Sequence, residues 1–336
     1  MADKLLEIKN LSIEYNTEIA TVYAVNGMNL SLDHGETLGL VGETGAGKTT
    51  TALSIMRLLP EGIGEVTAGS ILLDGHDMLK ISEEDVRNLR GNTVSMIFQD
   101  PMSSLNPVMT VGDQILEVLA IHNENVSKDE LNKKVDQMME LVGIPANRKN
   151  EYPHEFSGGM KQRIIIAIAL ACEPKLILAD EPTTALDVTI QAQMLGLIND
   201  LQKRLNTAMI LITHDLGVVA QTCEKVAVMY AGEVIEYGRA EHIFSGKYLH
   251  PYTQGLFNAI PKLDEDVKRL ETIDGMIPDP TERMEGCRFA SRCKYAKERC
   301  KNAPDMIEIE EQHYIKCHLF AESKDKNAGR DEKDGR

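Results

Sequence analysis

A glycine-rich segment, residues 42–49, carries the residue types that can wrap a polyphosphate. It fits the phosphate-binding loop pattern G-x-x-x-x-G-K-[ST] at every position. Its three glycines lack a Cβ, so the backbone N–H groups can turn inward around phosphate oxygens at a helix N-terminus. Lys48 supplies a full positive charge for the β- and γ-phosphates, and Thr49 offers a hydroxyl to Mg²⁺. A glycine-rich strand-to-helix turn that binds nothing is the alternative interpretation.

Two later apolar segments each end in polar residues that suit phosphate chemistry. Residues 175–179 lead to Asp180 and Glu181, an arrangement in which a strand end presents the first carboxylate to Mg²⁺. Glu181 is then available as the general base that polarises the attacking water. Residues 209–213 lead to His214, whose neutral imidazole could hydrogen-bond the γ-phosphate. Taken singly, acidic residues at a strand end commonly serve only to solvate a loop, and a lone His is more often structural.

A second anion-binding element is predicted at Ser157-Gly158-Gly159, which precede the apolar run 164–172. Small residues at a helix start leave backbone N–H groups open, and the apolar run indicates that the helix is buried. Because the first loop already holds one nucleotide, this element makes most sense facing a nucleotide held by another subunit. A plain Ser N-cap followed by two glycines is the alternative.

An aromatic residue upstream of the phosphate loop, Tyr15, could stack on an adenine ring. An ordinary half-buried strand aromatic is an equally good interpretation of Tyr15. Tyr23 is a rival for the same role, and the sequence alone leaves the choice open.

The elements around these residues indicate an α/β fold. The apolar residues 37–41 predict a buried strand that enters the phosphate loop, with a helix to follow it. Asn26-Gly27 and Asp74-Gly75 are hairpin signals, and they predict an antiparallel β flap beside the core sheet. A capping box begins at Ser127 and helical spacing follows it, so we expect a helical subdomain over about residues 100–165.

The composition restricts the class of protein. With 336 residues, 43% of them hydrophobic, the chain can bury a substantial core. A formal net charge of -16 argues against nucleic acid as the main partner, because duplex affinity depends on clustered Lys and Arg. The longest apolar run is far shorter than the roughly 20 residues of a spanning helix, and the first residues do not begin a signal peptide. We therefore expect a cytosolic chain whose six Cys are reduced or metal-bound rather than disulfide-paired.

Together these segments resemble the ABC-type ATPase family over roughly residues 4–245. The resemblance implies a P-loop NTPase fold with a mixed core sheet, ATP and Mg²⁺ as ligands, and a head-to-tail dimer with two composite sites. Phe156 and Met160 stand where the family's commonest form has Leu and Gln, a variation that spares the small residues between them. A soluble ABC ATPase acting on ribosomes or DNA has the same site. However, ribosome-acting members usually carry two cassettes, and chromosome-organising ones interpose a long coiled coil.

The resemblance also implies roles for individual residues. The catalytic group is Lys48, Gln99, Glu181 and His214. The ATP contacts are those four residues together with Tyr15, Gly42, Glu43, Thr44, Gly45, Ala46, Gly47, Thr49, Thr50 and Asp180. The Mg²⁺ ligands among them are Thr49, Gln99 and Asp180. The residues expected to contact the ATP of the partner subunit are Ser157, Gly158, Gly159 and Asp187.

A closer resemblance rests on residues 98–107, 152–157 and 250–253, which are similar to segments of the ATP-binding subunits of bacterial oligopeptide and dipeptide importers. It implies a second ATPase subunit, identical or related, and two membrane permease subunits at the cytoplasmic side of the cell membrane. Substrate would arrive indirectly, through an extracytoplasmic peptide-binding protein. Nickel importers of the same family are the nearest rival, although their cassettes usually lack so long a C-terminal extension.

The C-terminal extension, residues 249–322, is broken by prolines and is too small to build much core alone. Five, six and sixteen residues separate its four cysteines, which are Cys287, Cys293, Cys300 and Cys317. Four thiolates suit zinc or an iron–sulfur cluster, and free thiols are a third interpretation. The resemblance favours a [4Fe–4S] cluster, which some peptide-importer ATPases carry on this pattern. We expect an ATPase domain over residues 1–248 and a charged, disordered tail over residues 323–336.

Overall fold

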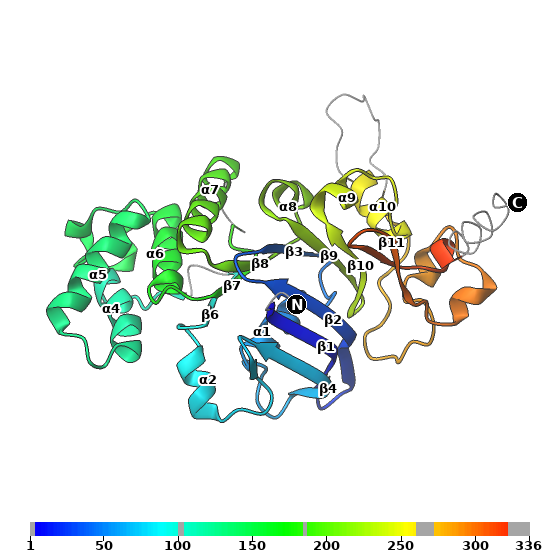
Figure 1. The fold of residues 1–336 in the computed structure, drawn as a ribbon, viewed down its shortest axis with the longest axis horizontal. Coiled ribbons are helices and arrows are strands. Elements are labelled where there is room, and N and C mark those ends of the chain that lie inside the picture. The colour runs from blue at the N-terminus through cyan, green and yellow to red at the C-terminus, as the bar shows by residue number, and fades with distance from the viewer. Residues whose placement is uncertain (1–3, 100–103, 184–186, 260–271, 322–336) are drawn as a thin grey trace, which may run out of the picture.

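The structure, a computed structural model, describes residues 4–99, 104–183, 187–259 and 272–321. Its centre is an eight-stranded sheet in the order β11-β12-β10-β9-β3-β8-β7-β6 (Figure 1). The strands are β3 (Thr37–Val41), β6 (Val94–Ile97), β7 (Leu176–Asp180), β8 (Ala208–Thr213), β9 (Lys225–Tyr230), β10 (Glu233–Arg239), β11 (Met306–Glu310) and β12 (His313–Lys316). From β9 to β6 the strands are parallel, so the carboxyl ends of β3, β7 and β8 lie at one edge of the sheet.

The apolar runs seen in the sequence form the parallel strands of this sheet. They are apolar throughout because both faces of the sheet are covered. Every residue of β3, β7 and β8 is buried. Along β8, Met209 and Leu211 belong to one hydrophobic cluster, whereas Ile210 and Ile212 belong to the other. A strand buried on both faces has no polar face, which explains why its sequence does not alternate.

The antiparallel flap is a four-stranded sheet in the order β2-β1-β4-β5. Its strands are β1 (Lys4–Asn16), β2 (Thr21–Asp33), β4 (Gly64–Leu73) and β5 (His76–Asp77). The turn predicted at Asp74-Gly75 is confirmed, since both residues have positive φ and join β4 to β5. The hairpin predicted at Asn26-Gly27 is wrong. Those residues lie inside β2 at a bulge, because pairing of the long strand with β1 overrides the local turn signal.

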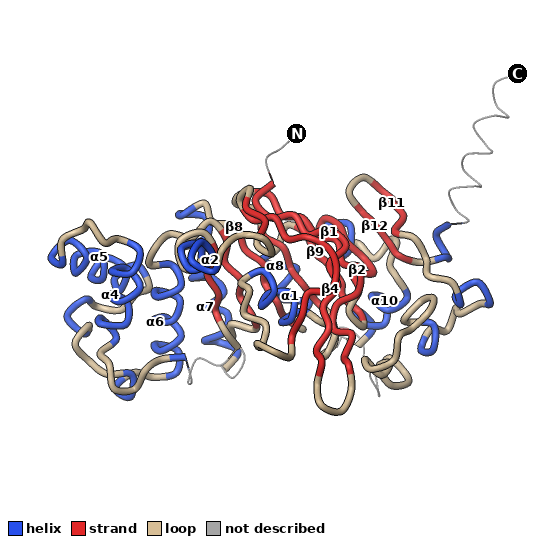
Figure 2. Tube along the Cα trace, turned by 90° about the horizontal axis from the view of Figure 1, so that it is seen from below, coloured by secondary structure: helices blue, strands red, loops and turns tan. Residues whose placement is uncertain are grey.

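Some helices lie against the strands, and others form a separate group at one end of the molecule (Figure 2). They are α1 (Lys48–Ile55), α2 (Glu83–Leu89), α4 (Val111–His122), α5 (Lys128–Leu141), α6 (Gly158–Leu170), α7 (Val188–Leu205), α8 (Leu216–Thr222), α9 (Ala240–Phe244) and α10 (Pro251–Asn258). Helices α4 and α5 pack on each other and on α6, away from the flap. The capping box predicted at Ser127 is confirmed, with Glu130 as its second member. None of the described helices is both long enough and apolar enough to cross a membrane.

The C-terminal segment continues the core sheet across the boundary expected near residue 248. Strand β12 pairs antiparallel with β10, and β11 pairs with β12. Short 3-10 helices lie nearby and in the helical group, at Ala146–Arg148, Pro153–Glu155, Ala290–Arg292 and Glu298–Lys301. Some residues considered in the sequence analysis lie outside the described residues: 100–103 within the segment 98–107, 184–186 next to Asp187, and the tail 323–336. The division into domains therefore stays a prediction.

Candidate functional site

The phosphate loop connects β3 to α1, and its conformation requires glycine. Gly42, Gly45 and Gly47 have φ values of 153°, 81° and 98°. A Cβ on Gly42 would lie 2.2 Å from the carbonyl oxygen of Met229, and one on Gly47 would lie 2.5 Å from that of Ala24. The pattern therefore reflects the backbone path, which only residues without a Cβ can follow here.

Lys48 is buried at the start of α1, with its ammonium folded back over the loop. Its Nζ donates to the carbonyl oxygens of Gly42, at 2.7 Å, and Glu43, at 3.1 Å. Burial lowers the pKa of Lys48, and the charges of Glu181 and Asp180 oppose that shift. The cation is therefore held between the loop and the carboxylates, where the β- and γ-phosphates are expected.

The predicted Mg²⁺ ligands Thr49 and Asp180 lie together. Burial raises the pKa of Asp180, while a hydrogen bond with Thr49 opposes the shift. The third predicted ligand, Gln99, reaches the neighbouring carboxylate, with Nε2 donating to Glu181 Oε2 at 3.0 Å. A hydroxyl, a carboxylate and an amide oxygen form the hard oxygen donor set that Mg²⁺ prefers.

Glu181 joins the residues predicted to be catalytic. Gln99 donates to its Oε2, and its Oε1 lies 3.1 Å from Nδ1 of His214. These three residues follow β6, β7 and β8, so the parallel topology brings them to one edge. Glu181 has a φ of 45°, a left-handed conformation that costs a non-glycine residue of order 1–3 kcal/mol. Its N–H donates to Ile212 O at 2.9 Å, which holds the backbone in this turn beside β8.

The residues predicted to face a partner's nucleotide lie at exposed helix starts. Ser157 is the N-cap of α6, and its Oγ accepts from Met160 N at 3.4 Å. Ser157 and Gly158 are exposed, which leaves the helix N-terminus open to solvent. Asp187 is exposed as well, and its carboxylate caps α7 by accepting from Ile190 N at 2.9 Å. Their roles toward a second subunit stay predictions.

The two aromatic candidates for the adenine have different surroundings. Tyr15 lies on β1 and donates from its Oη to Oγ1 of Thr50 at 3.2 Å, beside the start of α1. The ring of Tyr23 instead has the Arg283 guanidinium carbon 4.9 Å from its centroid. Tyr15 is thus placed near the loop, but stacking on adenine stays a prediction.

Two contacts that the sequence did not indicate attach the C-terminal segment to the phosphate loop. Arg292 forms a two-point ion pair with Glu43, at 2.7 Å from Nη1 to Oε2 and 3.2 Å from Nη2 to Oε1. The N–H of Glu43 also donates to Tyr252 Oη at 2.9 Å. Tyr252 lies in the segment 250–253, which contributed to the family resemblance. No sequence pattern near Tyr252 or Arg292 indicated contact with the phosphate loop, which lies more than two hundred residues earlier in the chain.

A third unpredicted contact links α6, the helix capped by Ser157, to the segment after Glu181. Gln162, on α6, is only 1% exposed, and its Nε2 donates to Pro182 O at 2.6 Å. A buried amide of this kind fixes the backbone that it contacts. Movement of α6 would therefore be transmitted to the position of the predicted general base.

The Arg292 contact gives a testable prediction. In Arg292→Ala, Glu43 loses its counter-charge and keeps a free carboxylate beside the phosphates. Because hydrogen bonds to charged groups contribute about 1.5–3 kcal/mol, we expect ATP to bind roughly 10-fold to 100-fold more weakly. Nucleotide titration by calorimetry measures this, and Arg239→Ala, which removes an exposed ion pair with Glu241, is the control. Unchanged ATP affinity in Arg292→Ala would contradict the interpretation.

The four cysteines of the C-terminal segment line one cavity together with apolar side chains, including Phe289. Cys287 N donates to Cys300 O at 2.9 Å, which ties two parts of this segment together. Burial raises the pKa of Cys287, of Cys293 and, to about 11, of Cys317. The remaining cysteines, Cys172 and Cys223, belong to the ATPase region.

Comparison with known proteins first gives the class. Residues 25–184 match the ABC transporter family. The fold is similar to a dimeric ATP-binding cassette in a post-hydrolysis state with ADP and Pi (TM-score 0.63, 26% identity, 70% of this chain and 98% of that one). It is also similar to cbiO1 of Clostridium perfringens, part of an ABC transporter complex (TM-score 0.62, 30% identity, 73% and 92%). The protein is therefore an ATP-hydrolysing ABC cassette, and the predicted fold class and ATPase activity are confirmed.

The comparisons then give the family. Residues 235–300 match the oligopeptide/dipeptide transporter C-terminal region. The oligopeptide transport ATP-binding protein OppD of Bacillus subtilis is 50% identical, over 94% of this chain and 89% of its own length. The dipeptide transport ATP-binding protein DppD of the same organism is 48% identical, over 94% and 95%. The chain belongs to this family of transport ATP-binding proteins, as its resemblance predicted.

Proposed function

We propose that ATP hydrolysis by this chain powers the import of dipeptides or oligopeptides. The observation that carries the proposal is the similarity to peptide transport ATP-binding proteins over more than nine-tenths of the chain, including the C-terminal region. Its partners would be a second ATPase subunit, identical or related, and two membrane permease subunits. A peptide-binding protein outside the membrane would deliver substrate to them, and the chain would lie peripherally at the cytoplasmic side.

The site residues fall into distinct roles in this proposal. Lys48 clamps the β- and γ-phosphates, and Asp180 and Thr49 hold Mg²⁺, which neutralises phosphate charge when bound. Glu181 accepts a proton from the attacking water, and His214 orients that carboxylate through its Nδ1. Gln99 connects the same carboxylate to the segment that leads into the helical group.

The composite dimer accounts for the open N-terminus of α6. Ser157 and Gly158 are exposed, so the hydroxyl hydrogen of Ser157 and the backbone N–H groups at this helix start could donate to phosphates held by the partner subunit. The contact of Gln162 with Pro182 then connects that interface to Glu181 in the same chain. Closure of the two subunits around ATP would thus align the general base, Glu181. We propose that dimerisation and hydrolysis are coupled in this way.

We further propose that Cys287, Cys293, Cys300 and Cys317 hold a [4Fe–4S] cluster. All four line one cavity. Along the chain, five, six and sixteen residues separate them, which is wider than the C-x₂₋₄-C spacing typical of structural zinc. The four thiolates would hold the cluster, which would brace a segment with little core of its own.

Peptide uptake tests the transport proposal. Cells lacking this gene are expected to lose uptake of labelled dipeptides or oligopeptides and to regain it with the wild-type gene. Nickel uptake, measured in the same strains, is expected to stay unchanged. Normal peptide uptake together with lost nickel uptake would move the assignment to the nickel importers. Loss of neither would favour an ABC ATPase that is not tied to transport.

A further inference from the structure

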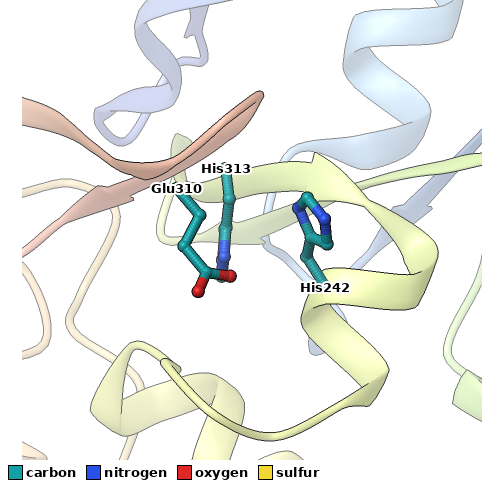
Figure 3. A group of neighbouring side chains, drawn as sticks. All are labelled: His242, Glu310 and His313. Atoms are coloured by element: carbon teal, nitrogen blue, oxygen red, sulfur yellow. The ribbon is translucent and has the colours of Figure 1, made fainter.

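Three potential metal ligands meet outside the nucleotide site, between the cassette and the C-terminal hairpin. His242 lies on α9, Glu310 ends β11, and His313 begins β12 (Figure 3). One potential ligand atom from each residue lies within 4.8 Å of the other two. The two imidazole rings are 6.2 Å apart and inclined by 37°. Two imidazoles and a carboxylate therefore converge from segments that are about seventy residues apart.

Both histidines have an unpaired buried nitrogen. His313 is fully buried, and its Nε2 lies 2.8 Å from Oε1 of Glu236. The Nδ1 atoms of His313 and His242 are buried without a hydrogen-bond partner. An unsatisfied buried polar atom is destabilising, so it calls for an explanation. A bound cation would give each of these nitrogens a partner.

The environment of His313 is that of a metal-binding histidine. Glu236 is itself fully buried and accepts from His250 N at 2.9 Å, which fixes its carboxylate. When Nε2–H of His313 donates to that carboxylate, the lone pair remains on Nδ1. A carboxylate behind an imidazole sets the tautomer and ring orientation in many metal sites. The buried pair thus prepares His313 to coordinate through Nδ1.

We propose that His242, Glu310 and His313 bind one divalent transition-metal ion of the Zn²⁺ type. Two imidazole nitrogens and one carboxylate oxygen suit this ion, with water in a fourth position. Bonds of about 2.1 Å place tetrahedral ligands roughly 3.4 Å apart, so ligand atoms that already lie within 4.8 Å of one another must close by at most about 1.4 Å. Lys247 pairs with Oε1 of Glu310, but it is 61% exposed and can turn into solvent when a metal binds.

The position of this site gives it a structural consequence. His242 belongs to the cassette, whereas Glu310 and His313 belong to the hairpin that extends the core sheet. One ion bound by all three would fasten the hairpin to α9. The site uses no cysteine and no residue of the nucleotide site, so it stands whether or not the proposed transport function is correct.

Cobalt titration of the full-length protein tests the site separately from the cysteines. Co²⁺ bound by nitrogen and oxygen absorbs weakly in the visible region, whereas thiolate ligands add an intense near-ultraviolet band. In the difference spectrum against the same protein without cobalt, we expect one equivalent of Co²⁺ with visible bands and no thiolate band, displaced by Zn²⁺ but not by Mg²⁺. Zn²⁺ is also expected to raise the melting temperature by roughly 2–5 °C.

Four variants decide the proposal. Affinity for Co²⁺ is expected to fall at least 100-fold in His242→Gln and in His313→Gln, and about 10-fold in Glu310→Gln. Because His313 is buried and could be needed for folding, His242→Gln carries the test, with ATP binding as the check of its fold. Glu311→Gln, an exposed neighbour on the same hairpin, is the matched control and should bind normally. No binding by wild type, a thiolate band alone, or normal binding by His242→Gln would each overturn the proposal.

Discussion

Glu181→Gln is expected to retain ATP binding and to lose most turnover, by about 10²–10⁴-fold. The amide keeps the size of the side chain and can still contact Gln99 and His214, but it cannot accept a proton from the attacking water. ATP should then remain bound between two subunits. Phosphate release under saturating Mg²⁺-ATP measures the loss, and size-exclusion chromatography with ATP should show an accumulated dimer.

The control for this variant is Glu173→Gln. Glu173 is exposed, precedes the same strand β7 at its other end, and has a comparable φ of 52°. The Glu173→Gln variant makes the same charge change at a residue with the same backbone strain, but away from the site. Its turnover should therefore match that of wild type. Turnover near the wild-type rate in Glu181→Gln would show that another group activates the water.

The second large effect is expected at the cysteine cavity. Protein purified without oxygen should be brown and contain iron and sulfide in equal amounts. Removing one ligand leaves one iron without its thiolate, so each single change should bleach the protein; the changes are Cys287→Ser, Cys293→Ser, Cys300→Ser and Cys317→Ser. Visible absorption and elemental analysis measure the result.

Cys172→Ser is the matched control for the cysteine experiment. Cys172 lies in the ATPase region, where its thiol contacts Val118 O at 3.7 Å, and its replacement should leave the colour intact. Colourless protein that loses one equivalent of zinc in each Cys→Ser variant would instead favour the zinc alternative, because zinc held by His242, Glu310 and His313 does not depend on the cysteines. Metal-free protein with an ordered C-terminal segment would remove the need for any metal there.

The sequence predicted those parts of the site in which the local backbone conformation dictates the residue types. Gly42, Gly45 and Gly47 could be predicted because the positive φ values of the loop favour residues without a Cβ. Glu181 and His214, which follow β7 and β8, could be predicted because buried parallel strands are continuous apolar runs in the sequence. Parallel order then brings those strand ends together without any further information.

The remaining contacts depend on pairings that no local pattern records. Asn26-Gly27 has the composition of a hairpin turn, yet pairing with β1 keeps it inside one strand. Arg292 and Glu43 are 249 residues apart and meet only after the C-terminal segment has folded back on the cassette. His242 and His313 are also ordinary residues in the sequence, and become notable only when β12 is placed on β10.

The addition of β11 and β12 to the core sheet has a consequence for solubility. Without the hairpin, β10 would be an edge strand with a row of unpaired N–H and C=O groups, a template for pairing with another chain. The hairpin moves the edge to β11, which has only five residues and exposes Glu308. Short, charged edges resist such pairing. A fragment ending at residue 248 would therefore be prone to self-association even with its ATP site intact.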